Sequence, residues 1–99
     1  MKQFASGDWV VAEGKEDEFL QRWTEFLQWT KAEAPGFIEA HLLQDAENPR
    51  HFVSLSEWSD GSARTNWRTK EDFRSHLDAA RSVCDEFSNS DYGLATEVK

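Results

Sequence analysis

The N-terminal third of the chain changes from one hydrophobic period to another. Three apolar residues lie side by side at positions 9–11, which is typical of a strand covered on both faces, and we expect that strand to span residues 4–13. Across residues 15–34 the apolar positions recur every three or four residues, as on one face of an amphipathic helix of about five turns. Pro35 and Gly36 end this helix, because proline disfavours a helical residue before it and glycine accepts a left-handed exit.

The middle of the chain predicts an antiparallel hairpin. Residues 36–44 and 50–58 have the composition of strands, and residues 45–49 have that of a turn. Side chains alternate along a strand, so one face of the second strand carries Phe52, Ser54, Ser56 and Trp58. The opposite face carries His51, Val53, Leu55 and Glu57. Both faces contain apolar groups, so we expect both to pack against something.

The C-terminal third predicts two helices and a last strand. Residues 59–62 form a turn or helix cap before a short helix that runs through Trp67, and residues 69–72 resemble a capping box that opens a longer helix. The apolar positions that define the longer helix are Phe73, Leu77, Ala80, Cys84 and Phe87. Residues 88–91 break it, and residues 92–98 predict a terminal strand.

The order strand, helix, strand, strand, helix, strand is the split βαβ pattern of the ferredoxin-like α+β fold, here as one domain over residues 1–99. Such an antiparallel sheet carries its helices on one face and leaves the other face bare. An apolar bare face would be a large exposed hydrophobic patch, so we expect two copies to pack face to face as a homodimer.

Composition and charge exclude several classes of protein. Ninety-nine residues fit one domain, and thirteen per cent aromatic content is too high for a disordered chain. A formal charge of -8 makes nucleic acid and anionic membrane surfaces poor partners. The single cysteine, Cys84, excludes an internal disulfide and is expected to be a small core residue on its helix. No apolar run suits a signal peptide or a membrane helix, and we expect a cytoplasmic protein.

Several segments, taken in order, resemble the antibiotic biosynthesis monooxygenase (ABM) domains. They are Gly14 with the acidic turn before Phe19, Ala-Pro-Gly-Phe at 34–37, Arg-His-Phe-Val-Ser at 50–54, Glu-Trp-Ser at 57–59, and Asn-Trp-Arg at 66–68 followed by Phe73. The resemblance covers residues 4 to about 98 and implies a dimeric α+β barrel. Relatives of this kind include cofactor-free oxygenases of polycyclic aromatic phenols, haem-degrading monooxygenases, and aldolase-like and isomerase-like proteins.

The resemblance also points to particular residues. The tryptophan that closes the third strand of the cofactor-free oxygenases corresponds to Trp58, whereas their strand asparagine falls at Ser54 and their following tyrosine at Arg64. The tryptophan of the haem-degrading relatives corresponds to Trp67. His76 falls one residue short of the haem ligand of those proteins, a rotation of about 100° on a helix.

The candidate site lies between the sheet and the helices. His76, at the margin of the buried stripe, is the candidate general base or ligand; alternatively it is a histidine that bonds a neighbour at the core edge. The residues expected to line a substrate pocket are Trp58, Trp67, Phe73, Ser54, Ser56 and Asn66. Flat apolar walls with a few polar groups suit a planar aromatic ligand, although large aromatic residues at such a seam also serve as packing.

Metal binding has little support, because the three histidines lie on three different elements and no metal-ligand spacing is present. The resemblance makes the leading hypothesis a cofactor-independent monooxygenase that acts on a small phenol- or quinol-like aromatic and needs neither metal nor cofactor. Two alternatives stay open. One is a non-catalytic binding or structural dimer whose pocket is filled by its own aromatic side chains, and the other is a haem-binding or haem-degrading monooxygenase.

Overall fold

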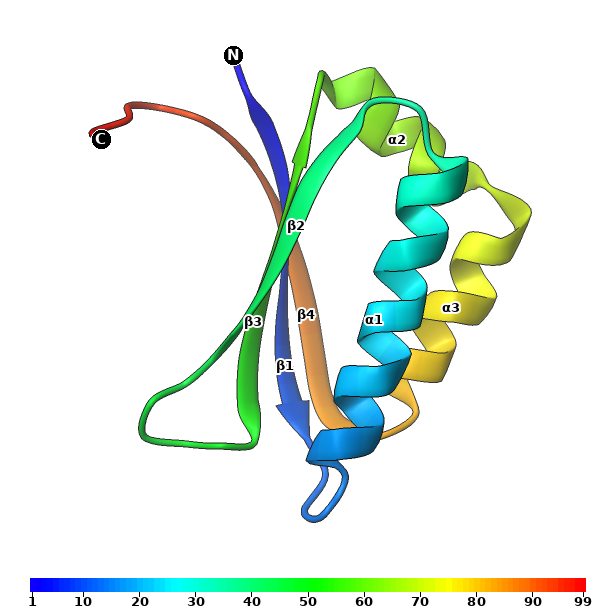
Figure 1. The fold of residues 1–99 in the computed structure, drawn as a ribbon, viewed down its shortest axis with the longest axis vertical. Helices are drawn as coiled ribbons and strands as arrows, with labels where there is room; N and C mark the ends of the chain where they lie inside the picture. Colours follow the sequence, from blue (N-terminus) through cyan, green and yellow to red (C-terminus); the bar gives the residue numbers. More distant parts are fainter.

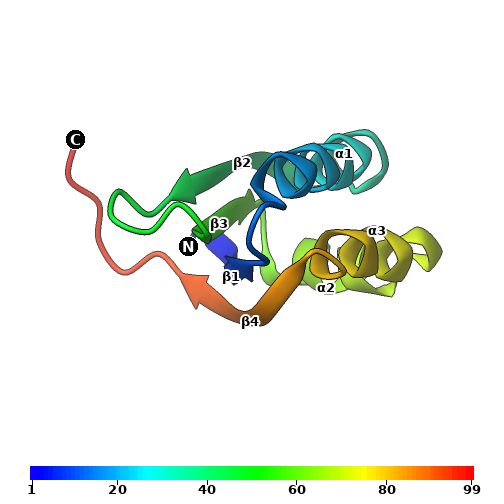
Figure 2. The same cartoon turned by 90° about the horizontal axis from the view of Figure 1, so that it is seen from below.

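The computed structural model describes residues 1–99 and has the expected α+β architecture (Figure 1). The elements are β1 (Gln3–Val11), α1 (Glu16–Glu33), β2 (Phe37–Gln44), β3 (His51–Trp58), α2 (Gly61–Thr69), α3 (Glu71–Arg81) and β4 (Cys84–Gly93). The four strands form one antiparallel sheet in the order β2-β3-β1-β4. All three helices lie on the same face of this sheet (Figure 2), which confirms the predicted ferredoxin-like fold.

Strand β1 lies inside the sheet and has one buried face. Ala5, Trp9 and Val11 are buried beneath the helices, and the intervening Asp8 is exposed. Its neighbours are β3 on one side and β4 on the other. Within one chain the helices therefore cover only one face of the strand that the sequence predicts to be covered on both.

Helix α1 follows the sequence prediction closely. Acidic residues crowd its first turn, where the helix dipole favours negative charge, and its buried face carries Phe19 and Phe26. After Glu33 the chain becomes extended at Ala34, and Gly36 has a φ of 88°, the left-handed exit that only glycine adopts easily. None of the helices reaches the combination of length and hydropathy that a membrane-spanning segment needs.

The prediction for the C-terminal part was wrong in its boundaries. Helix α3 ends at Arg81 rather than near residue 87, and the last strand is β4, at Cys84–Gly93, rather than residues 92–98. The strand pairs with β1 from Val11↔Cys84 to Gln3↔Gly93. Cys84 and Phe87 therefore reach the core from a strand, and the backbone hydrogen bonds to β1 override an apolar spacing that also fits a helix.

The helix caps agree with the sequence in one case and differ in the other. The Asp60 side chain accepts a hydrogen bond from the Ala63 N–H at 2.8 Å, so residues 59–62 do cap α2. The predicted capping box at 69–72 is absent, because Lys70 occupies the cap position of α3 and makes no side-chain bond there. Thr69 instead donates back to the Asn66 carbonyl.

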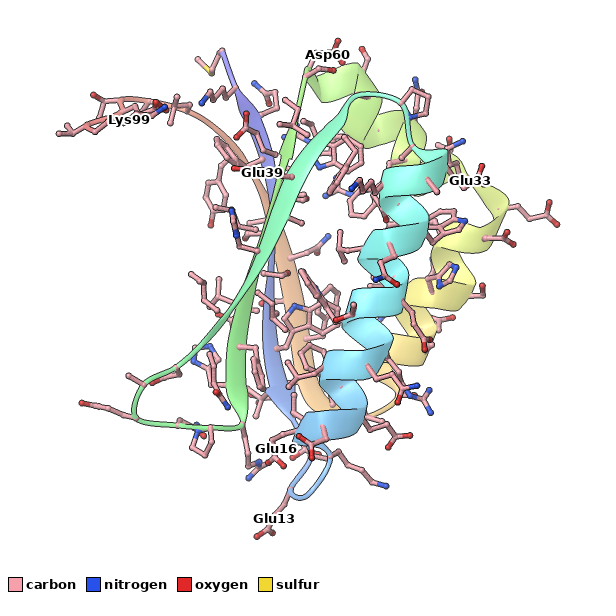
Figure 3. All side chains as sticks on the ribbon, in the orientation of Figure 1. Glu13, Glu16, Glu33, Glu39, Asp60 and Lys99 are labelled. Carbon is pink, nitrogen blue, oxygen red and sulfur yellow. The ribbon has the colours of Figure 1, made fainter.

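Side chains of the sheet and of the helices meet in the layer between them (Figure 3) and form two cores. The first, here called the Phe19–Phe52 core, consists of Trp9, Val11, Phe19, Phe52, Ala80 and Val83. The second, here called the tryptophan core, consists of Ala5, Phe26, Ala34, Trp58 and Trp67. The two cores lie at opposite ends of the same layer, since β1 contributes Val11 to one and Ala5 to the other.

The outer face of the sheet, opposite the helices, is partly apolar. It includes Phe4, Val10, Val53, Leu55, Leu43 and Tyr92, of which Leu43 and Tyr92 are 60% and 55% exposed. On the same face His51 lies between two carboxylates, with its Nδ1 2.9 Å from Asp45 and its Nε2 2.9 Å from Asp8. The hydrogen bond with Asp45, followed by that with Asp8, raises the pKa of His51.

Candidate functional site

A partly open cavity of about 50 Å³ lies between the sheet and the helices. It is built from the central strands β1 and β3, the edge strand β4 and all three helices. Its apolar wall consists of Ala5, Trp9, Trp23, Phe26, Leu27, Trp67, Leu77 and Phe87. Leu55, whose side chain belongs to the opposite face of the sheet, also borders it. The remaining lining residues are Ser6, Gly7, Ser54, Ser56, Arg68 and Asn89. This predominance of aromatic side chains, with a few polar groups, is the usual composition of a small-molecule site.

The size of the cavity limits what it holds in this conformation. One water molecule needs roughly 10–15 Å³ of such space, so the cavity has room for a few waters. Sites for drug-sized ligands are usually about 300–1,000 Å³. A ligand as large as a substituted phenol therefore requires wall side chains to move.

Hydroxyl groups pair with the indole N–H groups around the cavity. The Trp9 Nε1–H donates to Ser54 Oγ at 3.0 Å, and the Trp58 Nε1–H donates to Ser56 Oγ at 2.9 Å. These bonds fix the orientation of the tryptophan rings. They also mean that both serines, expected to orient a ligand, already accept a hydrogen bond from the protein.

Gly7 forms the floor of the cavity because it faces Ser54 across the β1–β3 ladder. A Cβ at this position would lie 2.6 Å from Ser54 Oγ and 2.7 Å from Trp9 Nε1. Real Cβ contacts are not so short, so any larger side chain would displace the serine or the indole. Glycine therefore keeps open the part of the cavity nearest the sheet.

The expected pocket residues divide into three groups. Ser54, Ser56 and Trp67 line the cavity. Trp58 and Phe73 lie outside it and support Trp67, with ring centroids 4.7 and 4.8 Å away. The last, Asn66, lines a separate surface depression with Pro35, Ala63 and Lys70, so the structure does not bring it to this cavity.

His76 also lies away from the cavity. Its ring stacks on Trp29 with a centroid distance of 4.8 Å and lies parallel to Phe26 at 6.1 Å. The structure thus places it between α1 and α3, outside the set of lining residues. Its role as a general base stays a prediction from the sequence, and the geometry gives it no direct route to a ligand in the cavity.

The donor atoms of the wall do not suit haem. Haem iron is ligated by His, Cys, Met or Tyr, and none of these residues lines the cavity. Across residues 1–99, no group of three or more His, Cys, Asp or Glu side chains is arranged to hold a metal ion. We therefore derive no chemistry through haem at this site.

Cys84 has no reactive environment. It lies half-buried at the start of β4 against the Phe19–Phe52 core rather than on a helix. Burial, followed by the charge of Asp85, raises the pKa of its thiol to about 11. It is therefore a protonated, apolar packing residue at neutral pH, in keeping with the role expected from the sequence.

Sequence reasoning missed several wall residues. Gly7 and Trp9 follow the same alternation on β1 as Ala5, and this alternation was the signal that could have found them. The strand β4 residues Phe87 and Asn89 could not be found while that segment was assigned to a helix and a turn.

The comparisons with known proteins agree with this architecture. The model of the family described as antibiotic biosynthesis monooxygenase matches residues 7–79. SnoaB, a cofactor-independent oxygenase from Streptomyces nogalater, is 18% identical, with a TM-score of 0.88 and coverage of 98% of this chain and 96% of that one. A conserved protein from Methanosarcina mazei Go1 is 20% identical, with a TM-score of 0.82 and coverage of 93% and 91%. Structural matches at this identity show the fold alone. No curated protein matches the sequence.

Proposed function

We propose that this chain, which belongs to the antibiotic biosynthesis monooxygenase family, is a cofactor-independent monooxygenase of a small phenol- or quinol-like aromatic. The observation that carries the proposal is the cavity between sheet and helices, whose wall is mainly aromatic and contains few polar groups. The likeness to SnoaB, which is described as cofactor-independent, favours this class over one with a bound cofactor.

In the proposed reaction the substrate supplies both electrons. Loss of the phenolic proton makes the ring electron-rich. A ring carbon that carries a hydrogen atom then forms a covalent bond with one atom of O₂. The resulting ring-bound peroxide loses water, so one oxygen atom stays on the ring as a carbonyl and the other leaves as water. No external reductant is needed. The protein contributes orientation and a site from which bulk water is excluded.

Entry of a ligand requires the wall to open, and the residues placed to do so are Trp23 and Leu27. Both line the cavity and also a surface groove between α1 and β2 that extends along Phe37 and Ile38. They are the side chains that separate the two spaces. Rotation of Trp23 would join the small cavity to a groove of about 340 Å³ and so make room for an aromatic ring.

We also propose that the protein acts as a homodimer in the cytoplasm. The support is the outer face of the sheet, where Leu43 and Tyr92 are more than half exposed beside half-buried Val53 and Leu55. Packing two such faces together removes an apolar patch from water. Sedimentation at micromolar concentration tests this part, and a stable monomer would contradict it.

Oxygen uptake with a panel of phenols and quinols, without added cofactor, tests the proposed activity. The informative variant is Gly7→Ala, which fills the floor of the cavity. The new Cβ displaces Ser54 or Trp9 at the cavity wall, so we expect kcat/KM to fall about tenfold or more, which is about 1.4 kcal/mol of transition-state stabilisation. The matched control is Gly61→Ala, where the nearest atom to the new Cβ is 3.7 Å away, and its activity should equal that of the unaltered protein.

A second candidate function is ligand binding without catalysis. It is favoured by the absence of any histidine or carboxylate from the cavity wall. In that case aromatic ligands would quench tryptophan fluorescence in the unaltered protein and in the Gly61→Ala variant, and no oxygen would be consumed. The absence of oxygen uptake across the whole panel would therefore replace the first candidate by the second.

A further inference from the structure

Arg68 is the only charged side chain among the lining residues of the cavity. It projects from α2 and is 27% exposed. Every other polar residue of the wall is a neutral serine or asparagine. The positive charge is therefore concentrated at one point of an otherwise neutral and mainly aromatic surface.

The guanidinium of Arg68 is held in place by Asp91 on β4. Its Nη1 donates to Asp91 Oδ2 at 2.7 Å and its Nη2 to Asp91 Oδ1 at 2.5 Å, a bidentate pair. These bonds do not use all the N–H groups of the guanidinium, and no other protein acceptor binds the rest. Arg68 is thus a fixed donor with spare N–H groups beside the cavity.

Asp91 does not neutralise this end of the cavity, because it serves two arginines. The Arg64 Nε lies 3.5 Å from Asp91 Oδ2, and its Nη1 donates to the Phe4 carbonyl at 2.8 Å. The Nε atom is buried and has no hydrogen-bond partner. Two cations facing one carboxylate leave a net positive charge here, in a protein whose formal charge is -8.

We infer that the cavity selects aromatic ligands with an acidic hydroxyl group, and that Arg68 binds the oxygen of that group in its ionised form. This inference rests on the proposed function, because it names the substrate class of the same site. A fixed cation beside an apolar wall favours the phenolate over the neutral phenol. The O–H bond breaks, the electron pair stays on the ligand oxygen, and water accepts the proton. The site then needs no histidine or carboxylate in its wall to generate the reactive phenolate.

The test is a spectrophotometric titration of 4-nitrophenol with an excess of the full-length protein, since the phenolate of this compound is coloured. We expect the unaltered protein to lower the pKa of the bound phenol by about one unit, the size of one favourable charged contact. At alkaline pH it should bind 4-nitrophenol about tenfold more tightly than 4-nitroanisole, its methyl ether, which cannot ionise.

Three variants test the role of Arg68. Arg68→Gln should abolish the pKa shift while 4-nitroanisole still binds. The matched control, Arg74→Gln, removes the same charge from the exposed surface of α3 and should behave like the unaltered protein. Asp91→Asn removes the competing negative charge while its amide oxygen still accepts a hydrogen bond from Arg68, so the pKa of the bound phenol should fall further. The Asp91→Asn result decides the matter even if Arg68→Gln does not fold.

The inference is overturned if the shift persists in Arg68→Gln, if Asp91→Asn reduces it, or if the unaltered protein binds 4-nitrophenol without a shift or does not bind it. None of these readouts depends on turnover. A protein that shifts the pKa but consumes no oxygen contradicts the proposed function alone. A protein whose turnover and pH profile are unchanged in Arg68→Gln contradicts the inference alone.

Discussion

The two cores of this protein are joined to their surroundings in different ways. The Phe19–Phe52 core is held mainly by contacts between apolar groups, such as Phe19 against Phe52 with ring centroids 5.2 Å apart, and only its Trp9 indole donates a hydrogen bond, to Ser54. The tryptophan core is tied by hydrogen bonds from buried indoles, for example from Trp67 to Thr30 at 2.9 Å. Apolar packing is non-directional, whereas a buried hydrogen bond fixes one orientation.

The cavity adjoins both cores, and side chains of each core line it. The Phe19–Phe52 core contributes Trp9, and the tryptophan core contributes Trp67, Phe26 and Ala5. Each core supplies one wall tryptophan whose ring is fixed by a hydrogen bond, Trp9 to Ser54 and Trp67 to Thr30, and the rest of the first core supplies mainly stability. A small domain can thus retain a cavity in its interior when the tryptophan side chains around that cavity are fixed by hydrogen bonds.

The largest effect should come from Phe52→Ala in the Phe19–Phe52 core. Phe52 is 2% exposed, and removal of a buried phenyl ring costs about 3–5 kcal/mol in the free energy of unfolding. Urea unfolding measures the change. Leu20→Ala, at a position that is 42% exposed on α1, is the control and should stay within about 0.5 kcal/mol. A small loss for Phe52→Ala would show that this end of the molecule is not the main source of stability.

The reactivity of the Cys84 thiol indicates how well water is excluded from the core that contains Phe19 and Phe52. With a pKa of about 11, its thiolate fraction at pH 8 should be about a hundredfold below that of a free cysteine. The rate of alkylation by iodoacetamide, measured from pH 7 to 10, should be slow and should still rise at the top of this range. Alkylation as fast as that of glutathione would mean that water reaches this core.

In the tryptophan core, Thr30→Val removes the acceptor of the Trp67 N–H without changing the size of the side chain. A buried donor left unpaired costs about 1–3 kcal/mol in the free energy of unfolding. The same substitution made in a Trp67→Phe background should cost less, because no donor is left unpaired. Equal costs in the two backgrounds would contradict the role given to this hydrogen bond.

The smallest effect concerns His51, on the outer face. Its pKa is raised by Asp45 first and by Asp8 second, while its hydrogen bond lowers the pKa of Asp45. The histidine contribution is fully present below its unfolded pKa of about 6.5 and is lost as pH rises through the higher folded value. The Asp45 contribution is present above about pH 4 and is lost on acidification.

His51→Gln should therefore destabilise the protein most between about pH 4.5 and 6.5, and least above pH 9. Thermal unfolding at a fixed protein concentration measures this, because a dimer would make the midpoint concentration-dependent. The control is His41→Gln, whose side chain is 64% exposed and lies 3.6 Å from Glu39. A loss of stability that does not vary with pH would rule out the charged bridge.

The fold could be predicted from the sequence where one period dominates. The spacing along α1 and the alternation of Phe52, Ser54, Ser56 and Trp58 on β3 gave the right elements and the right inward face. The segment around Cys84 and Phe87 could not be assigned correctly, because its apolar spacing fits a helix and its polar composition is poor for a strand. Pairing with β1, which is remote in sequence, decides its conformation.

The candidate site was predictable only in part for the same reason. Ser54, Ser56 and Trp67 stand out in the sequence and do reach the cavity. Gly7 reaches it because the β1–β3 register places it opposite Ser54, and Asn89 reaches it because β4 adds to the other side of β1. The alternation along β1 marks the inward face of Gly7, but its pairing with Ser54 and the place of Asn89 depend on strand register, which local patterns do not contain.

Gly7 has one further consequence. Because Gly7 has only a hydrogen atom where other residues have a side chain, this position determines how close to the sheet a ligand in the cavity could lie. Substitution there would alter the size class of compound admitted and leave the Arg68 end of the recess untouched. New selectivity among related proteins could therefore arise from a change at a single codon.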